Sequence, residues 1–167
     1  MTDASSSSTN PFTCAEVAEK TRDYERARAI LRGTQRLLRT HGFESLSEVT
    51  LGNGRRADVL ALRRNGEFWI VEIKSSIADF RSDSKWQEYR DYCDAFLFAV
   101  APDFPSEILP AETGLILADA YAGELIRSPP AHPLAAARRK ALTLAMARTA
   151  SMRLHASADP GLSIEEA

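Results

Sequence analysis

The stretch RADVLALRRNGEFWIVEIK, residues 56–74, decides the fold. It holds two apolar runs separated by Asn65-Gly66, a dipeptide typical of tight β-hairpin turns. We therefore predict paired antiparallel strands over residues 56–63 and 67–74. A third run, residues 45–51, is followed by the turn-forming sequence Gly52-Asn53-Gly54. Because both connections are short turns, the three runs predict an antiparallel meander.

Helices and further strands are predicted on either side of this meander. Apolar residues recur at helical spacing over about residues 23–41, and Gly42 is a suitable residue to end that helix. Ser84 and Gln87 form a capping-box pattern for a helix through Tyr92. The remaining predictions are strands at residues 95–101, 114–119 and 124–127, and an alanine-rich helix at residues 134–154. Strands interleaved with helices predict an α/β fold, a mixed sheet with helices on both faces.

The chain length and the composition of the two ends predict one domain with loose termini. The sequence has 167 residues, 44% of them hydrophobic and 26% charged, as in ordinary globular domains. Residues 1–20 include four consecutive serines, Ser5 to Ser8, and are predicted to be disordered. Residues 21–155 form the predicted domain, and residues 156–167 form a short acidic tail.

Basic residues are concentrated near the two ends of the predicted domain, although the formal net charge is only −2. Between Lys20 and His41 there are seven basic and two acidic residues. Between Leu134 and His155 there are five basic residues and no acidic one. Two basic helices flanking an acidic centre are compatible with salt-sensitive binding to nucleic acid, which the net charge alone would not suggest.

The cysteines and the hydropathy pattern predict a cytoplasmic protein. Cys14 and Cys93 have neither a CxxC spacing nor a Cys/His pattern, so we expect reduced thiols in a reducing compartment. The N-terminus does not resemble a secretory signal. No apolar run approaches 18 residues, so no membrane-spanning segment is expected.

A group of charged side chains interrupts the two central strands. Glu72 and Lys74 are two residues apart on one strand and therefore point to the same face. Asp58 is an acid within the apolar run of the preceding strand. If the hairpin is centred on its Asn-Gly turn, Asp58 lies opposite roughly Lys74 and diagonal to Glu72. The three side chains are thus expected to converge on one face.

Two carboxylates beside a lysine are suited to metal-dependent phosphodiester hydrolysis. Asp58 and Glu72 would hold one or two Mg²⁺ ions, or Mn²⁺, and the backbone carbonyl of Ile73 could complete the coordination. Lys74 would orient the attacking water and stabilise the charged phosphorus centre. An edge ion pair without catalytic function is the alternative interpretation of the Glu-Ile-Lys sequence.

Three further residues are possible accessory groups. Glu48, in the first predicted strand, is either a third ligand or general base, or a solvated edge residue. Lys85 and Tyr89 are four residues apart on the predicted helix, so they share a face and could touch a phosphate or the metal-bound water. The alternative is a solvent-facing lysine beside a packed tyrosine.

Other basic and hydroxyl residues are candidates for nucleic-acid contacts. The predicted contacts are Arg55, Arg56, Ser75, Arg32 and Arg36. An ordinary basic turn would equally explain the two adjacent arginines. A helix or turn cap formed by Ser76 and Asp79 is the alternative interpretation of the two serines that follow Lys74.

At this level of detail the sequence resembles a known family. Asp58 followed by Glu72-Ile73-Lys74 resembles the signature of the PD-(D/E)XK nuclease superfamily, which implies a restriction endonuclease-like αβββαβ core. The segments GRRADVLAL (54–62), IVEIKSSIADFRSDSKWQEYRDYCDAFLFAV (70–100) and GLILADAYAGELIR (114–127) resemble the MmcB family of bacterial DNA repair proteins.

The resemblance implies metal ligation by Asp58 and Glu72 and a catalytic role for Lys74. The chain departs from the superfamily pattern in three places. Ala57 replaces the proline before the aspartate. Leu31-Arg32 occupies the region where some members carry a helix glutamate, so Glu48 would have to supply a third ligand. Lys85 stands where some members have glutamine.

Three functional hypotheses remain after the sequence analysis. The first is a Mg²⁺-dependent nuclease that acts on DNA during repair. The second is a non-catalytic module of the same fold that binds DNA or other repair proteins. The third is an RNA-directed or unrelated α/β protein whose acids are structural. The combination of two acids with a lysine favours the first, because a binding module does not need it.

Overall fold

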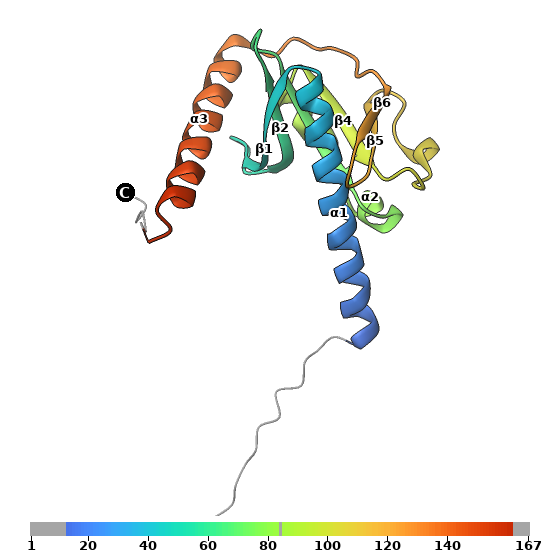
Figure 1. The fold of residues 1–167 in the computed structure, drawn as a ribbon. Coiled ribbons are helices and arrows are strands. Elements are labelled where there is room, and N and C mark those ends of the chain that lie inside the picture. The colour runs from blue at the N-terminus through green and yellow to red at the C-terminus, as the bar shows by residue number, and fades with distance from the viewer. Residues whose placement is uncertain (1–12, 84, 162–167) are drawn as a thin grey trace, which may run out of the picture.

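The computed structural model describes residues 13–83 and 85–161, which form a mixed α/β fold (Figure 1). The elements in chain order are α1 (Cys14–Thr40), β1 (Phe43–Thr50), β2 (Arg56–Arg63), β3 (Phe68–Lys74), α2 (Ile77–Ser82), the 3₁₀ helix η1 (Trp86–Tyr92), β4 (Ala95–Val100), the 3₁₀ helix η2 (Ser106–Ile108), β5 (Gly114–Ala118), β6 (Gly123–Arg127) and α3 (Ala136–Ala158). This arrangement is consistent with the expected restriction endonuclease-like core.

The six strands form one mixed sheet in sequence order. Strands β1, β2 and β3 pair antiparallel, which confirms the predicted meander. Strands β3, β4 and β5 are parallel, and β6 returns antiparallel. Every residue of β4 is buried, as the uninterrupted apolar sequence of that strand predicts. The carboxyl end of β3 therefore lies in the middle of the sheet, beside the end of a fully buried strand.

The hairpin between β2 and β3 has a different register from the predicted one. Arg63 N–H donates to the carbonyl of Glu67 at 2.9 Å, so three residues form the loop, and Gly66 has a φ of 88°. Val59 pairs with Val71. In this register Asp58 lies directly opposite Glu72, and its predicted position opposite Lys74 was wrong. The prediction centred the hairpin on Asn65-Gly66. In the structure residues 64–66 form a three-residue loop, which Gly66 closes in the left-handed conformation.

Helix α1 covers one face of the sheet and begins earlier than predicted. A capping box, in which Thr13 and Glu16 exchange hydrogen bonds, starts the helix nine residues before the expected position. Its C-terminal half buries Ile30 and Leu38 against the sheet, while its N-terminal half extends beyond the sheet (Figure 1). Residues 1–12 of the predicted disordered segment lie outside the described residues, and so do residues 162–167 of the tail.

A close approach fixes where α1 crosses the sheet. A Cβ atom at Gly33 would lie 2.2 Å from the carbonyl oxygen of Asp119, so only glycine fits at this position. Arg36, one turn further along, donates to the carbonyl of Tyr121 at 2.7 Å. Both contacts attach α1 to the turn between β5 and β6.

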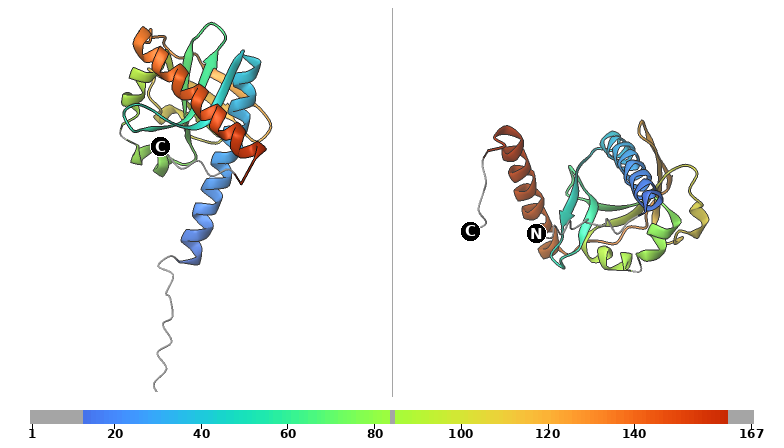
Figure 2. Two further views of the ribbon diagram at one scale, coloured as in Figure 1. Left: turned by 90° about the vertical axis from the view of Figure 1, so that its left-hand side faces the viewer. Right: turned by 90° about the horizontal axis from the view of Figure 1, so that it is seen from below.

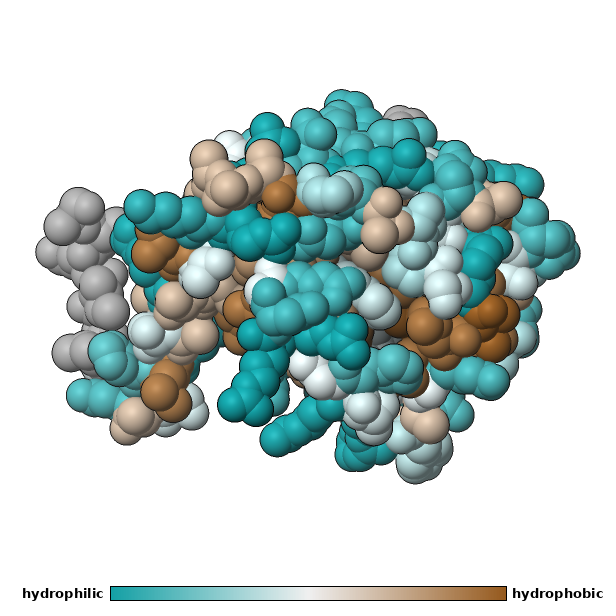
Figure 3. Space-filling model, turned by 90° about the horizontal axis from the view of Figure 1, so that it is seen from above, coloured by the Kyte–Doolittle hydropathy of each residue, from teal (hydrophilic) through white to brown (hydrophobic). Residues whose placement is uncertain are grey.

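The opposite face of the sheet is covered by η1 and α3, so the predicted covering of both faces is confirmed (Figure 2). Trp86 and Tyr89 of η1 pack on this face, and Tyr89 stacks on Phe96 with ring centroids 5.8 Å apart. Helix α3 contributes Leu142 and Met146. Seen from above, the surface is mostly hydrophilic, with separate apolar patches on the left, where α3 lies, and on the right (Figure 3).

The segment after β3 is less regular than predicted. We expected a helix starting at Ser84, but Ser84 lies outside the described residues, and residues Trp86–Tyr92 form a 3₁₀ helix. A separate α-helix, α2, precedes it. The N-cap of α2 is Ser76, whose hydroxyl accepts a hydrogen bond from the N–H of Asp79. The capping interpretation of Ser76 and Asp79 is therefore confirmed.

Asp94, just before β4, links three parts of the fold. Its carboxylate accepts two hydrogen bonds from Arg139 of α3, at 2.7 and 2.8 Å. It also accepts hydrogen bonds from the N–H groups of Phe68, at 2.8 Å, and Leu134, at 2.9 Å. The start of β3, the start of β4 and the first turn of α3 therefore meet at one carboxylate.

Candidate functional site

Asp58 and Glu72 face each other where the ladder between β2 and β3 ends. The last regular pair is Val59 with Val71. In a continued register the N–H of Ile73 would bond to Ala57, but it donates instead to Asp58 Oδ2 at 2.8 Å. The N–H of Asp58 donates to Glu72 Oε1 at 3.2 Å. The Asp58 carboxylate thus replaces a ladder hydrogen bond, and the two contacts hold both side chains at the opening between the strands.

Burial and mutual repulsion make the acid pair difficult to ionise fully. Burial, followed by the charge of Asp58, raises the pKa of Glu72 to about 8. Burial also raises the pKa of Asp58, although the hydrogen bond from Ile73 and the charge of Lys74 oppose the shift. Two buried acids that repel each other are stabilised by a positive charge placed between them. The pair is therefore electrostatically suited to a cation.

Lys74 provides a positive charge next to this pair. Its side chain is only 5% exposed, and Nζ lies 4.0 Å from Glu72 Oε2. Nζ donates to Asp83 Oδ2 at 2.7 Å and lies 4.0 Å from Asp79 Oδ1. Burial alone would lower the pKa of Lys74, but the Asp83 hydrogen bond and the neighbouring acids outweigh it and raise the pKa. The ammonium is therefore charged and held in place.

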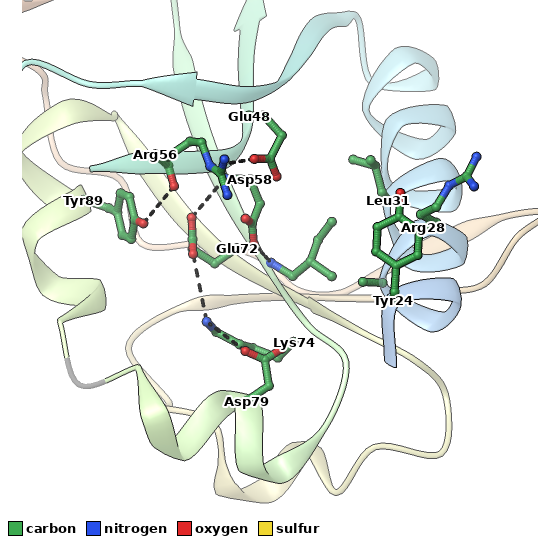
Figure 4. A pocket seen from close by; sticks show the side chains of 12 residues that line it. Tyr24, Arg28, Leu31, Glu48, Arg56, Asp58, Glu72, Lys74, Asp79 and Tyr89 are labelled. Atoms are coloured by element: carbon green, nitrogen blue, oxygen red, sulfur yellow. Dashed lines mark hydrogen bonds and ion pairs between the residues drawn. The ribbon is translucent and has the colours of Figure 1, made fainter. Parts of the chain in front are cut away.

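The three residues line a cleft of about 740 Å³ whose opposite side is formed by helix α1. The cleft is lined by Glu48, Arg56, Asp58, Glu72, Ile73 and Lys74 of the sheet, by Asp79 and Tyr89 of the helices after β3, and by Tyr24, Ala27, Arg28 and Leu31 of α1. Figure 4 shows the strand residues on one side and the labelled α1 residues across from them. Such concave sites with convergent polar groups are typical of ligand and substrate binding.

Glu48 lies in the same cleft, on a strained stretch of β1. It is the only non-glycine residue with a positive φ in the described part of the chain, at 54°. The register of β1 and β2 places it opposite Asp58, between the pairs Ser47–Val59 and Val49–Ala57. Such strain persists only where the surroundings enforce it, and it is frequent at functional sites.

The Glu48 carboxylate is held by an ion pair. Its Oε2 is 2.6 Å from Arg56 Nε, and about half of the side chain remains exposed. Arg56, predicted as a nucleic-acid contact, therefore has a carboxylate partner, although it does line the cleft. The predicted role of Glu48 as a ligand or base stays a prediction, now with its position in the cleft established.

Lys85 and Tyr89 do not share a face, so this expectation was wrong. A 3₁₀ helix has about three residues per turn, which separates positions four apart. Lys85 is exposed and is not among the residues that line the cleft. Tyr89 is buried, lines the cleft and donates its hydroxyl to the carbonyl of Arg56 at 3.1 Å. Burial and nearby acids raise its pKa, so the hydroxyl stays protonated.

The remaining predicted nucleic-acid residues are not brought together. Arg55 pairs with Glu88, with Nε and Oε2 2.5 Å apart. Ser75 is buried, and its N–H and hydroxyl both donate to Asp79, at 2.9 and 3.2 Å. Arg36 is bound to the turn between β5 and β6. Arg32 lines a smaller hollow that adjoins the cleft along α1.

The residues fit a metal only with help from ligands other than side chains. Across residues 13–83 and 85–161, no group of three or more His, Cys, Asp or Glu side chains has a metal-binding arrangement. Asp58 and Glu72 supply two hard oxygen donors. Because the N–H of Ile73 points to the β2 side, its carbonyl, on the same side of the strand, is directed there as well. Mg²⁺ commonly keeps several waters with one or two carboxylates, so this set is compatible with it.

Sequence reasoning missed Asp83 and the wall of the cleft formed by α1. A buried lysine needs an anionic partner, so the acids that follow Lys74 were a usable signal. Tyr24 and Arg28 could not be assigned in this way, although both fall inside the helix predicted over residues 23–41. Their position over the cleft depends on how α1 crosses the sheet.

The fold and the site define a mixed α/β domain with a buried glutamate, a half-buried aspartate and a buried lysine at the opening of its central hairpin. A family model described as DNA repair protein MmcB-like matches residues 15–161. The chain therefore belongs to the MmcB-like family, as the resemblance predicted.

One solved structure adds to this result. A protein of unknown function from Silicibacter pomeroyi, SPO1766, is 47% identical with a TM-score of 0.82, and the match covers 84% of this chain and 97% of that chain. Comparison with curated proteins found no match. In the described residues no helix combines the length and apolar character needed to cross a bilayer.

Proposed function

We propose that this protein is a metal-dependent nuclease of the PD-(D/E)XK type that hydrolyses phosphodiester bonds in DNA during repair. The observation that carries the proposal is the placement of Asp58 opposite Glu72, with Lys74 4.0 Å from the Glu72 carboxylate, in one cleft. Membership in a DNA repair family supports DNA as the substrate.

Asp58, Glu72 and the carbonyl of Ile73 would hold Mg²⁺ or Mn²⁺. When bound, the ion supplies Lewis acidity for activating water and neutralising charge on the phosphate. Both carboxylates are preorganised, because backbone N–H groups fix one oxygen of each. Loading the site requires the acid pair to release the proton that burial favours, so binding should strengthen as the pH rises.

Lys74 would stabilise negative charge on the phosphate that undergoes attack. Its hydrogen bond to Asp83 keeps it charged and fixes its position, so little reorganisation is needed when charge develops. Tyr89, held to the carbonyl of Arg56, closes the cleft on the η1 side. Glu48 is exposed enough to accept a proton from water and lies opposite Asp58.

Cleavage assays on single-stranded and duplex DNA with Mg²⁺ or Mn²⁺ test the proposal. Asp58→Ala and Lys74→Ala should each lower the rate by about 10²-fold or more, since each removes a charge from the reacting centre. Glu44→Ala and Lys140→Ala are matched controls, because both residues are exposed and lie outside the cleft. Cleavage that survives both site variants would reject the site.

A non-catalytic DNA-binding or partner-binding module is the second candidate function. One observation favours it: within residues 13–83 and 85–161, no three His, Cys, Asp or Glu side chains are arranged to hold a metal. In that case the purified protein would bind DNA without cutting it in any metal, and Asp58→Ala would leave that binding unchanged.

A further inference from the structure

Helix α1 presents an aromatic ring and a cation across the cleft from the acid pair. Tyr24 lines the cleft, yet its side chain is 64% exposed. The Arg28 guanidinium lies over its ring, 5.8 Å from the centroid. Figure 4 shows the Tyr24 ring on the side of α1 that is nearer to Glu72 and Lys74, whereas the Arg28 side chain extends from α1 away from them. Because Tyr24 is mostly exposed, packing of the fold does not account for it.

Arginines along the same wall are available for an anion. Across residues 13–83 and 85–161, neither Arg28 nor Arg32 has a carboxylate partner, whereas Arg56 in the same cleft is paired with Glu48. A second hollow, of about 410 Å³, shares Arg28 and Leu31 with the cleft and continues to Arg32. A path for a chain of phosphates therefore leads from the acid pair along α1.

The shape of the cleft favours an unpaired strand. Glu72 lies at the floor of the cleft and is only 4% exposed, and α1 lines the opposite side. In a duplex the faces of the bases are covered by stacking, so a tyrosine ring can stack only on a base that is unpaired or turned out. An exposed ring with an adjacent arginine is the combination by which proteins hold single strands.

We propose that the cleft binds single-stranded DNA, with one base against Tyr24 and the adjacent phosphates at Arg28 and Arg32. This inference rests on the proposed function, because it names the substrate class of the same site. It assigns α1 the role of selecting the strand that reaches Asp58 and Glu72, and it predicts that continuous duplex binds more weakly.

Binding of the full chain to labelled DNA, measured by fluorescence anisotropy in EDTA, tests the inference separately from cleavage. The probes are a short single strand of mixed sequence and the same strand annealed to its complement. Tyr24→Ala should weaken single-strand binding about tenfold, or about 1.4 kcal/mol, since it removes the stacking of one base. Tyr24→Phe should stay within about twofold, because it keeps the ring. Arg28→Ala should lower the slope of log K against log salt concentration by about 1, the contribution of one phosphate contact.

Tyr121→Ala is the matched control, because Tyr121 is 80% exposed and lies on the turn between β5 and β6. Equal affinity for both probes, an unchanged affinity in Tyr24→Ala, or an equal loss in Tyr121→Ala would overturn the inference. Tyr24-dependent binding without any cleavage would support this inference and reject the nuclease proposal. Efficient cleavage of continuous duplex at a rate independent of Tyr24 would support the nuclease proposal and reject this inference.

Discussion

Arg153, near the end of α3, donates to the carbonyl oxygen of Glu48 at 2.9 Å, across 105 positions of sequence. A second donor of the same guanidinium reaches the carbonyl of Ser47 at 2.6 Å. The residues of α3 around Arg153 are exposed, so these two hydrogen bonds connect the end of the helix to β1. It holds the backbone at the point where Glu48 adopts its positive φ.

Arg153→Ala should therefore loosen β1 at Glu48 without unfolding the domain. We expect faster amide hydrogen exchange around Glu48, a kcat lowered several-fold with KM nearly unchanged, and a loss of stability of about 1 kcal/mol or less. Arg148→Ala, another exposed arginine of α3, is the control and should change none of these. Identical amide exchange in wild type and Arg153→Ala would show that the two Arg153 hydrogen bonds do not restrain β1.

The strain at Glu48 has its own test, which separates its backbone from its carboxylate. With φ at 54°, any residue with a Cβ atom is disfavoured there by roughly 1–2 kcal/mol, whereas glycine is not. Glu48→Gly and Glu48→Ala both remove the carboxylate. The glycine variant should nevertheless be more stable by about 1 kcal/mol in denaturant unfolding. If the alanine variant is equally stable, the positive φ is not enforced in solution.

Asp94 predicts how the fold responds to acid. Burial opposes its ionisation, but Arg139 and the N–H groups of Phe68 and Leu134 outweigh this and lower its pKa to about 2. A lowered pKa in the folded state stabilises the fold at pH values above the ordinary value of 3.8, and this stabilisation is lost as the pH falls toward 2. At neutral pH it amounts to roughly 2 kcal/mol.

Asp94→Asn should thus unfold more easily than wild type at pH 7, and the difference should shrink between pH 4 and pH 2. Urea unfolding at a series of pH values measures it. Asp91→Asn is the control, because Asp91 is largely exposed and its ion pair with Arg138 is on the surface. A difference between Asp94→Asn and wild type that does not vary with pH would contradict the assigned ion pair.

The sequence predicts most of the fold because the strand signals are local. The apolar runs and their turns predict β2 with its observed bounds, and the unbroken apolar run predicts that β4 is buried. The start of α1 was missed because its exposed first turns lack an apolar face. The register of the hairpin was missed because it depends on the conformation of Gly66.

The candidate site was predictable only in part. Asp58, Glu72 and Lys74 stand out because charges in apolar strands need partners. Which acid pairs with Lys74 and which arginine reaches Glu48 depend on tertiary packing, which brings Asp83 and Arg153 to the site. For the same reason, sequence alone does not reveal that Glu88 and Asp79 bind the nucleic-acid candidates Arg55 and Ser75, whose proposed role stays a prediction.

Glu72→Gln should stabilise the protein, and a divalent cation should cancel that advantage. The pKa of Glu72 is raised from 4.5 to about 8, so the folded state binds more protons than the unfolded state between these values, and stability falls as the pH rises through that window. The amide keeps the acceptor for the Asp58 N–H but carries no charge. The variant should therefore gain about 1 kcal/mol or more in stability at pH 8 and almost nothing at pH 4, measured through Tm.

Adding Mn²⁺ at pH 8 should raise the Tm of wild type and leave that of Glu72→Gln unchanged, because an ion that binds only the native state stabilises it. Equal Mn²⁺ shifts in both proteins would locate the ion elsewhere, and a variant less stable than wild type at pH 8 would mean that the acid pair is not repulsive.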